Sequence, residues 1–129
     1  MSEQGAALPA LLPQVTLLRV LLRRKELDDP RAAFFLRADE KGSGLSVNFD
    51  YTPEECRAQL CFNKTYGVRS LLVESVVQLE LGVEPDEPRH ANITGIPHVD
   101  DDASRAEYLA GQLENVSTLV SSGLVYNNQ

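Results

Sequence analysis

The segment from Tyr66 to Pro97 constrains the fold more than any other, because turn residues separate its apolar runs. Its first run, Val68–Val73, has the length and composition of a buried strand. A Ser-x-x-Gln capping box then begins a predicted helix, Ser75–Leu81, and Gly82 is placed to end that helix at positive φ. The stretch His90–Thr94 alternates polar and apolar residues, as a half-buried strand does. We therefore expect a strand, a short helix, a tight turn and a second strand.

The residues before this segment predict three more strands. Val15–Arg24 fits both a helical stripe and a strand, and its short length and the Asp-Asp-Pro sequence that follows favour a strand. Ala33–Ala38 predicts a strand that ends in the loop Asp39–Gly44. Leu45–Phe49 alternates strictly, with Leu, Val and Phe on the inner face. The last two runs are expected to pair as a hairpin across the loop.

A strong helix start follows at Thr52, where threonine caps, proline takes the first helical position and glutamate completes a capping box. We expect the helix to run to about Leu60 and to carry both Cys56 and Cys61. Five residues apart on a helix, the two thiols point about 140° apart, which is poor geometry for a disulfide. The sequence therefore predicts reduced cysteines, at least one of them buried.

Asp100–Asp102 supplies acidic charge at the start of a last helix, where the helix dipole favours it. That helix has apolar residues at helical spacing, at Ala106, Leu109, Ala110 and Leu113. Ser117–Ser121 is a candidate edge strand. These elements predict one α+β domain over residues 14–123, with a mixed or antiparallel sheet and two to three helices. A flexible arm, residues 1–13, is expected before it and a tail, residues 124–129, after it.

Composition limits the function classes. The chain has 129 residues, 43% of them hydrophobic and 24% charged, with a net charge of −7. An acidic chain repels phosphate backbones, so a nucleic-acid partner is not expected. No apolar run approaches the roughly 18 residues that cross a membrane. The patch Leu8–Leu12 is short, is interrupted by proline and has no basic residue before it, so we expect no signal peptide and a cytoplasmic location.

The only two histidines, His90 and His98, lie among aspartates and a glutamate. Their spacing matches no recognised metal signature, so we expect no metal site. Alternation along the strand puts His90 and Asn92 on one face. If that face meets Ser46 and Asn48 across the sheet, these four residues form a polar patch for binding a small ligand or for acid–base chemistry. The alternative is an ordinary solvent-exposed sheet face.

The order of elements resembles small ADP-ribosyltransferase-like domains. These begin with a strand that carries a basic residue, here Arg19, and continue with a strand that carries a hydroxyl residue, here Ser46, before a capped helix. The resemblance implies that both face a nicotinamide dinucleotide (NAD). It provides no match for the catalytic glutamate of that family, since His90 or Asn92 stands near that position.

A second resemblance rests on the runs Gly44–Val47, Tyr66–Val68 and His90–Gly95, which are similar to small uncharacterised bacterial proteins. It implies a bacterial origin and no particular activity.

Two functions follow from these observations. The acidic charge, the small size, the apolar arm and the lack of a catalytic signature favour a non-enzymatic, cytoplasmic protein-interaction module. Such a module would be an accessory, antitoxin-like or immunity-like subunit. We expect it to have no cofactor and to bind a protein partner or form a homo-oligomer. The alternative is an ADP-ribosyltransferase-like enzyme, or one that processes nucleotides or nucleic-acid ends, with Arg19, Ser46 and His90 as its catalytic residues and NAD as its cofactor. Convergence of these three side chains in one cleft would favour the enzyme.

Overall fold

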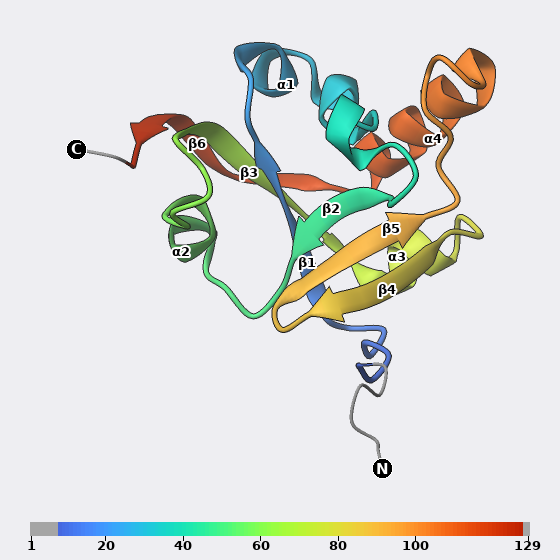
Figure 1. Ribbon diagram of the computed structural model, residues 1–129, viewed down its shortest axis with the longest axis horizontal. Helices are drawn as coiled ribbons and strands as arrows, with labels where there is room; N and C mark the ends of the chain where they lie inside the picture. Colours follow the sequence, from blue (N-terminus) through green and yellow to red (C-terminus); the bar gives the residue numbers. More distant parts are fainter. Residues whose placement is uncertain (1–7, 128–129) are drawn as a thin grey trace.

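The computed structural model describes residues 8–127 and folds them around one six-stranded antiparallel sheet (Figure 1). The strands lie in the order β4-β5-β2-β1-β3-β6, and every neighbouring pair is antiparallel. The predicted α+β class is confirmed. The strands are β1 (Thr16–Leu21), β2 (Leu45–Asn48), β3 (Lys64–Leu72), β4 (Gly82–Glu87), β5 (His90–Thr94) and β6 (Thr118–Tyr126).

The central strand, β1, is buried on both faces, and this explains its ambiguous sequence pattern. Leu17 and Leu21 point into the larger apolar core, while Leu18 and Val20 belong to a smaller cluster on the other face. A strand covered on both sides needs apolar residues at nearly every position, so alternation is lost. The strand expected within Val15–Arg24 is confirmed.

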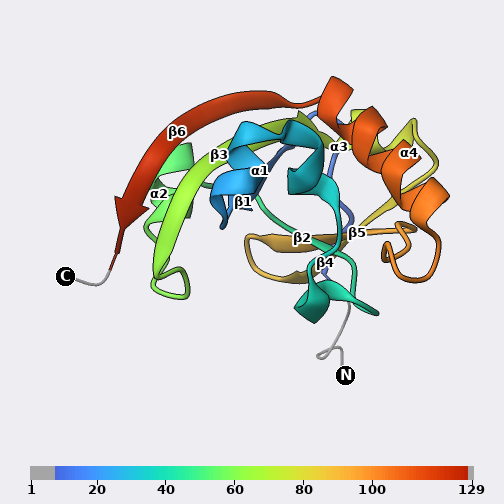
Figure 2. The ribbon, with the colours of Figure 1, turned by 90° about the horizontal axis from the view of Figure 1, so that it is seen from above.

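Helices cover the two faces unequally. The larger core lies between the sheet and the last helix, α4, which buries the four apolar residues predicted from their spacing. On the other face, Cys56 of α2 packs with the smaller cluster on β1 and β3. Figure 2 shows β3 and β6 curving together along one side of the molecule. The helices are α1 (Arg24–Asp28), α2 (Pro53–Arg57), α3 (Val73–Val77), α4 (Ala103–Asn115) and the 3-10 segments η1 (Pro30–Phe34) and η2 (Ala38–Glu40).

The strand predicted at Ala33–Ala38 is wrong, and so is its hairpin with Leu45–Phe49. Asp29 caps a 3-10 helix by accepting the backbone N–H of Arg31, and Pro30 supplies its first residue. Ala33 and Phe34 enter the core beneath α4 from η1, and Leu36 enters it from the irregular stretch that follows. Strand β2 pairs instead with β1 and β5. A short apolar run in a sequence is compatible with either a strand or a helical segment.

The helix predicted at Ser75–Leu81 begins earlier than expected. It is α3, its N-cap is Leu72, and no side chain caps it, so Ser75 has no capping role. The positive φ lies at Glu80 (φ 65°), whereas Gly82 already belongs to β4. Gly82 is required there for a different reason, because an added Cβ would lie 2.4 Å from the Thr94 Oγ1 atom.

The capping box of α2 is confirmed. The Thr52 hydroxyl accepts the Glu55 N–H at 3.1 Å, and the Glu55 carboxylate accepts the Thr52 N–H at 2.9 Å. The helix is shorter than predicted and ends at Arg57, which leaves Cys61 on an exposed turn. Both cysteines are free, as predicted. Burial raises the pKa of Cys56 to about 12, so this thiol stays protonated.

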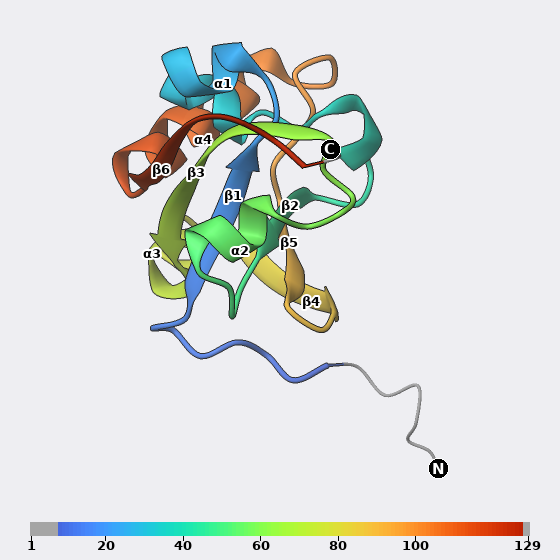
Figure 3. The same ribbon diagram turned by 90° about the vertical axis from the view of Figure 1, so that its left-hand side faces the viewer.

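The two chain ends differ from the expected arm and tail. Strand β6 extends to Tyr126 and so includes residues placed in the tail. Before β1, residues 8–13 form neither helix nor strand (Figure 3), yet Leu11 packs against the core and the Pro13 carbonyl accepts the Glu74 N–H at 2.9 Å. Residues 1–7 of the expected arm and residues 128–129 of the tail lie outside the described residues. Among residues 8–127, no helix has the length and apolar character needed to span a membrane.

Candidate functional site

Strands β2 and β5 bring the four predicted polar residues together. In their antiparallel register Ser46 pairs with Asn92, and Asn48 pairs with His90. The residues between them, Val47 and Ala91 among them, point into the larger core, so the polar side chains share the opposite face. The patch expected from the sequence therefore exists as a structure, and its role in binding stays a prediction.

A chain of two short hydrogen bonds runs through this patch. The Ser46 Oγ atom lies 2.6 Å from His90 Nε2, and His90 Nδ1 lies 2.5 Å from an oxygen of Asp86. Burial would raise the pKa of Asp86, but hydrogen bonds from His90 and Asn92 outweigh it and lower the pKa below its ordinary value. An ionised Asp86 can only accept, so Nδ1 of His90 carries a proton. With one proton on the ring, Nε2 is then the acceptor for the Ser46 hydroxyl.

A β-bulge brings Asp86 to the histidine. In the hairpin of β4 and β5, Pro85 pairs with Ala91 and Glu87 pairs with His90, so Asp86 is the extra residue between two paired ones. Bulges change the direction of a side chain and are frequent beside active sites. The second carboxylate oxygen of Asp86 accepts the Asn92 amide at 3.0 Å, which fixes the carboxylate from two sides.

The serine and the histidine open into a cleft of about 400 Å³. Its volume is within the range of small-ligand pockets. The aromatic ring of Tyr51 forms one wall and is covered by the Arg89 guanidinium, 3.7 Å from the ring centroid. The lining residues are Ser46, Asn48, Tyr51, Gln59, Cys61, Phe62, Glu87, Pro88 and His90. Among these described residues there is no lysine or arginine, so a ligand in the cleft meets hydroxyl, amide, imidazole, thiol, aromatic and carboxylate groups.

The buried ion pair of Arg19 and Glu40 binds the backbone of Ser46. Glu40 accepts the Ser46 N–H at 2.9 Å, and Arg19 donates to the Ser46 carbonyl at 2.9 Å. Arg19 is 0% exposed and lies on the face of the sheet opposite the Ser46 side chain. Arg19 therefore does not converge with Ser46 and His90 in the cleft. Its guanidinium supports the backbone of Ser46 and is not accessible to a ligand.

The pKa values of Arg19 and Glu40 are both shifted by burial and by ion pairing. Burial, and next the charge of Arg37, lower the pKa of Arg19. For Glu40, burial would raise the pKa, but the hydrogen bond and charge of Arg19 lower it below its ordinary value. Arg37 extends the cluster by donating to Glu26, which is 1% exposed, at 2.7 Å. The buried charges near the Ser46 backbone are thus paired, Arg19 with Glu40 and Arg37 with Glu26.

Sequence reasoning missed three contributors. The sequence assigns Asp86 no role beside His90, because a bulge has no reliable signature in one sequence. Glu40 falls within the predicted loop Asp39–Gly44, yet it is 5% exposed and bonded to a strand residue. Tyr51 lay between two predicted elements without any pattern. Within residues 8–127, no group of three or more His, Cys, Asp or Glu side chains is arranged to hold a metal ion.

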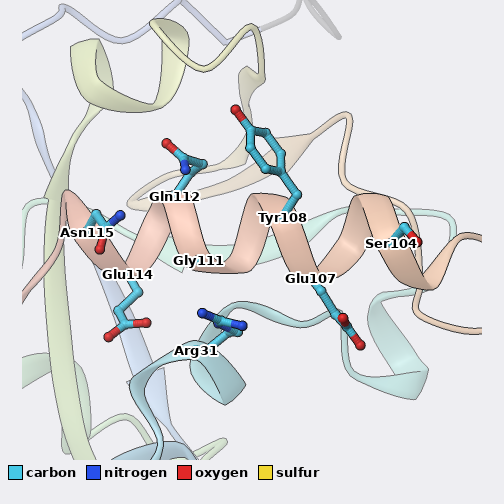
Figure 4. A pocket seen from close by; sticks show the side chains of 8 residues that line it. All are labelled: Arg31, Ser104, Glu107, Tyr108, Gly111, Gln112, Glu114 and Asn115. Atoms are coloured by element: carbon cyan, nitrogen blue, oxygen red, sulfur yellow. The ribbon is translucent and has the colours of Figure 1, made fainter.

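A second hollow, of about 410 Å³, lies on α4 around Arg31 (Figure 4). Arg31 projects from η1 toward Gly111, where an added Cβ would make ordinary van der Waals contact with the guanidinium, at 3.5 Å. Glu107 and Glu114 point to the same side of the helix, while Tyr108 points away. The hollow lies between α4 and η1, and its lining residues include neither histidine nor cysteine.

No family model, no curated protein and no solved structure matches this chain. The resemblances to ADP-ribosyltransferase-like domains and to small bacterial proteins therefore stay predictions, and the function is argued from the site alone.

Proposed function

We propose that this protein is an enzyme in which Ser46 attacks an acyl group of a small substrate bound in the cleft. The observation that carries the proposal is the continuous chain from the Ser46 hydroxyl through His90 to Asp86, at 2.6 Å and 2.5 Å. A serine bonded to a base that is itself oriented by a third group is the arrangement that activates a hydroxyl nucleophile.

The geometry assigns each group a role. His90 Nε2 takes the hydroxyl proton as the Ser46 oxygen forms a bond to the acyl carbon, and it then returns the proton to the leaving group as the old acyl bond breaks. A water molecule, deprotonated by the same nitrogen, releases the acyl group from Ser46 and restores the hydroxyl. Asp86 acts through the histidine as a positioning residue, because it keeps the proton on Nδ1 and stabilises the imidazolium that forms.

Asn48 is the group best placed to stabilise the oxyanion. It lies two residues from Ser46 on the same strand face, about 7 Å away along β2, so a reacting carbonyl fits between them. Its amide nitrogen donates to the Arg89 carbonyl at 3.1 Å, and among the described residues the second N–H has no partner. Amide donors in such positions stabilise developing negative charge.

The lining of the cleft indicates the substrate class. Phosphate groups are usually bound by lysine, arginine or a helix N-terminus, and the lining has no cationic side chain. This weighs against NAD and against nucleic-acid ends. Aromatic and amide side chains favour an uncharged organic ester or amide.

A fluorophosphonate probe tests the proposal without knowledge of the substrate. We expect the Ser46 oxygen to displace fluoride and form a phosphonyl ester, which peptide mass mapping locates. Labelling should vanish in Ser46→Ala and slow by about 10²- to 10⁴-fold in His90→Ala. His98→Ala is the matched control, because His98 also lies beside an aspartate, Asp100 at 3.5 Å. Absence of label at Ser46, or equal labelling rates in wild type and His90→Ala, would refute the proposal.

The protein-interaction module is the second candidate. It is supported by the exposed apolar residues of β6, among them Leu124 and Tyr126, on a strand that no helix covers completely. A stoichiometric partner retained by Ser46→Ala would favour this function independently of the cleft.

A further inference from the structure

The two edges of the sheet are built differently. Strand β4, at one edge, has charged residues and a proline, Glu84, Pro85, Asp86 and Glu87, which hinder pairing with another strand. Strand β6, at the other edge, has nine residues, Thr118–Tyr126, with no charge and no proline. Among the described residues its only strand partner is β3. Only the β6 edge is therefore open to a further strand.

Both faces of β6 are also unusually apolar for an exposed strand. Five of its large apolar side chains are exposed by 39% to 55%. They are Leu119, Val120, Leu124, Val125 and Tyr126. An exposed, long and apolar edge strand is a template for pairing with another chain, so this edge has the character of an interface.

We propose that β6 pairs with β6 of a second copy of this chain, antiparallel across a two-fold axis at Ser122, so that the two sheets become one. The sequence of the strand supports a second copy in particular, because it is nearly self-complementary. Antiparallel pairing about Ser122 sets Leu119 opposite Val125 and Val120 opposite Leu124. Each contact then occurs twice, as an isologous interface requires.

Charge confines pairing of two copies to an uncharged part of the surface. Each chain has a net charge of −7, so two copies repel over most of their surfaces. Strand β6 is a long uncharged stretch, and a pair of β6 strands sets no like charges opposite each other. Two register shifts against β3 bend the strand (Figure 2), and a second copy brings a strand with the same bend.

Light scattering during size-exclusion chromatography tests the association. We expect wild type to shift with concentration from the 14.2 kDa of one chain toward twice that mass. Val120→Lys and Leu124→Lys should hold the protein at the mass of one chain, with unchanged circular dichroism. Leu60→Lys is the matched control, because Leu60 is 83% exposed and lies outside β6. A wild type that is monomeric at every concentration, or a dimer that both β6 variants retain, overturns the proposal.

Cross-linking tests the register. In a Cys61→Ser background, which removes the exposed thiol, Ser122→Cys should form a covalent dimer with a short thiol-specific cross-linker. Leu119→Cys should not, because pairing about Ser122 separates the two copies of residue 119 by about 20 Å along the strands. Equal cross-linking of the two variants overturns the two-fold register.

Discussion

The guanidinium of Arg19 forms a bidentate ion pair with the carboxylate of Glu40, at 2.5 Å and 3.1 Å. Both groups are shielded from water, and between them they hold the N–H and the carbonyl of Ser46. The position of the Ser46 hydroxyl on the other face of the sheet therefore depends on charges that a ligand in the cleft never contacts.

Removing one member of this pair should be costly. Arg19→Ala leaves a buried carboxylate without its partner, and we expect it to lower the free energy of unfolding by about 3–5 kcal/mol. Urea denaturation measures the loss. Arg24→Ala is the matched control, since Arg24 pairs with Asp28 in solvent, where an ion pair contributes about 0–1 kcal/mol. Similar losses in the two variants would contradict the buried role.

Stability should fall in acid because of Glu26 and Glu40. Burial would raise the pKa of each carboxyl, but arginine partners outweigh it, so the folded-state pKa lies below the ordinary 4.5. A lowered pKa contributes stability above 4.5, and this contribution is lost as the pH falls through the folded-state pKa. We expect the melting temperature to drop steeply below pH 4.5 in wild type and less steeply in Glu26→Gln. A melting temperature independent of pH in this range would contradict the pairing.

The Asp86 carboxylate should determine which nitrogen of His90 carries the proton. In wild type at neutral pH, the ¹⁵N chemical shifts of the ring should show Nδ1 protonated. In Asp86→Asn the amide can donate to Nδ1, so the proton should move toward Nε2 and the rate of Ser46 labelling should fall by about 10²- to 10⁴-fold. Asp100→Asn, beside His98, is the control and should leave both His90 readouts unchanged. An unchanged tautomer in Asp86→Asn would remove Asp86 from the mechanism.

Gly82 should be intolerant of a side chain because of one neighbour. In Gly82→Ala the new Cβ would lie 2.4 Å from the Thr94 Oγ1 atom, and the β-branched threonine has little rotamer freedom with which to move away. We expect a lower melting temperature that is partly restored in the double variant Gly82→Ala/Thr94→Ala. Strictly additive effects of the two substitutions would show that the clash is not the cause.

The sequence predicted the polar half of the site because local rules determine it. Strict alternation in Leu45–Phe49 and in His90–Thr94 fixed which side chains share a face, and the two strands proved to be neighbours. The cap at Thr52 followed from four consecutive residues in the same way.

The remaining features depend on contacts distant in sequence. Arg19 appeared available to a ligand because its partner, Glu40, lies 21 residues away in a segment that was expected to be a loop. The segment Ala33–Ala38 has the composition of a strand, but its first two residues belong to η1 and its apolar side chains pack into the core. Asp86 required the exact pairing of a hairpin, which composition does not determine.

The bulge at Asp86 has a consequence for dynamics. It places the carboxylate that orients His90 on β4, the outermost strand, which β5 alone anchors among the described strands. Edge elements open by local fluctuations at a lower free energy than the strands of a core. Opening of the β4–β5 hairpin would withdraw the carboxylate while Ser46 stays fixed by its buried ion pair. Under the proposed function, the fraction of competent molecules is set by the free energy of opening this hairpin, which its amide-exchange protection measures, and not by the global stability of the domain.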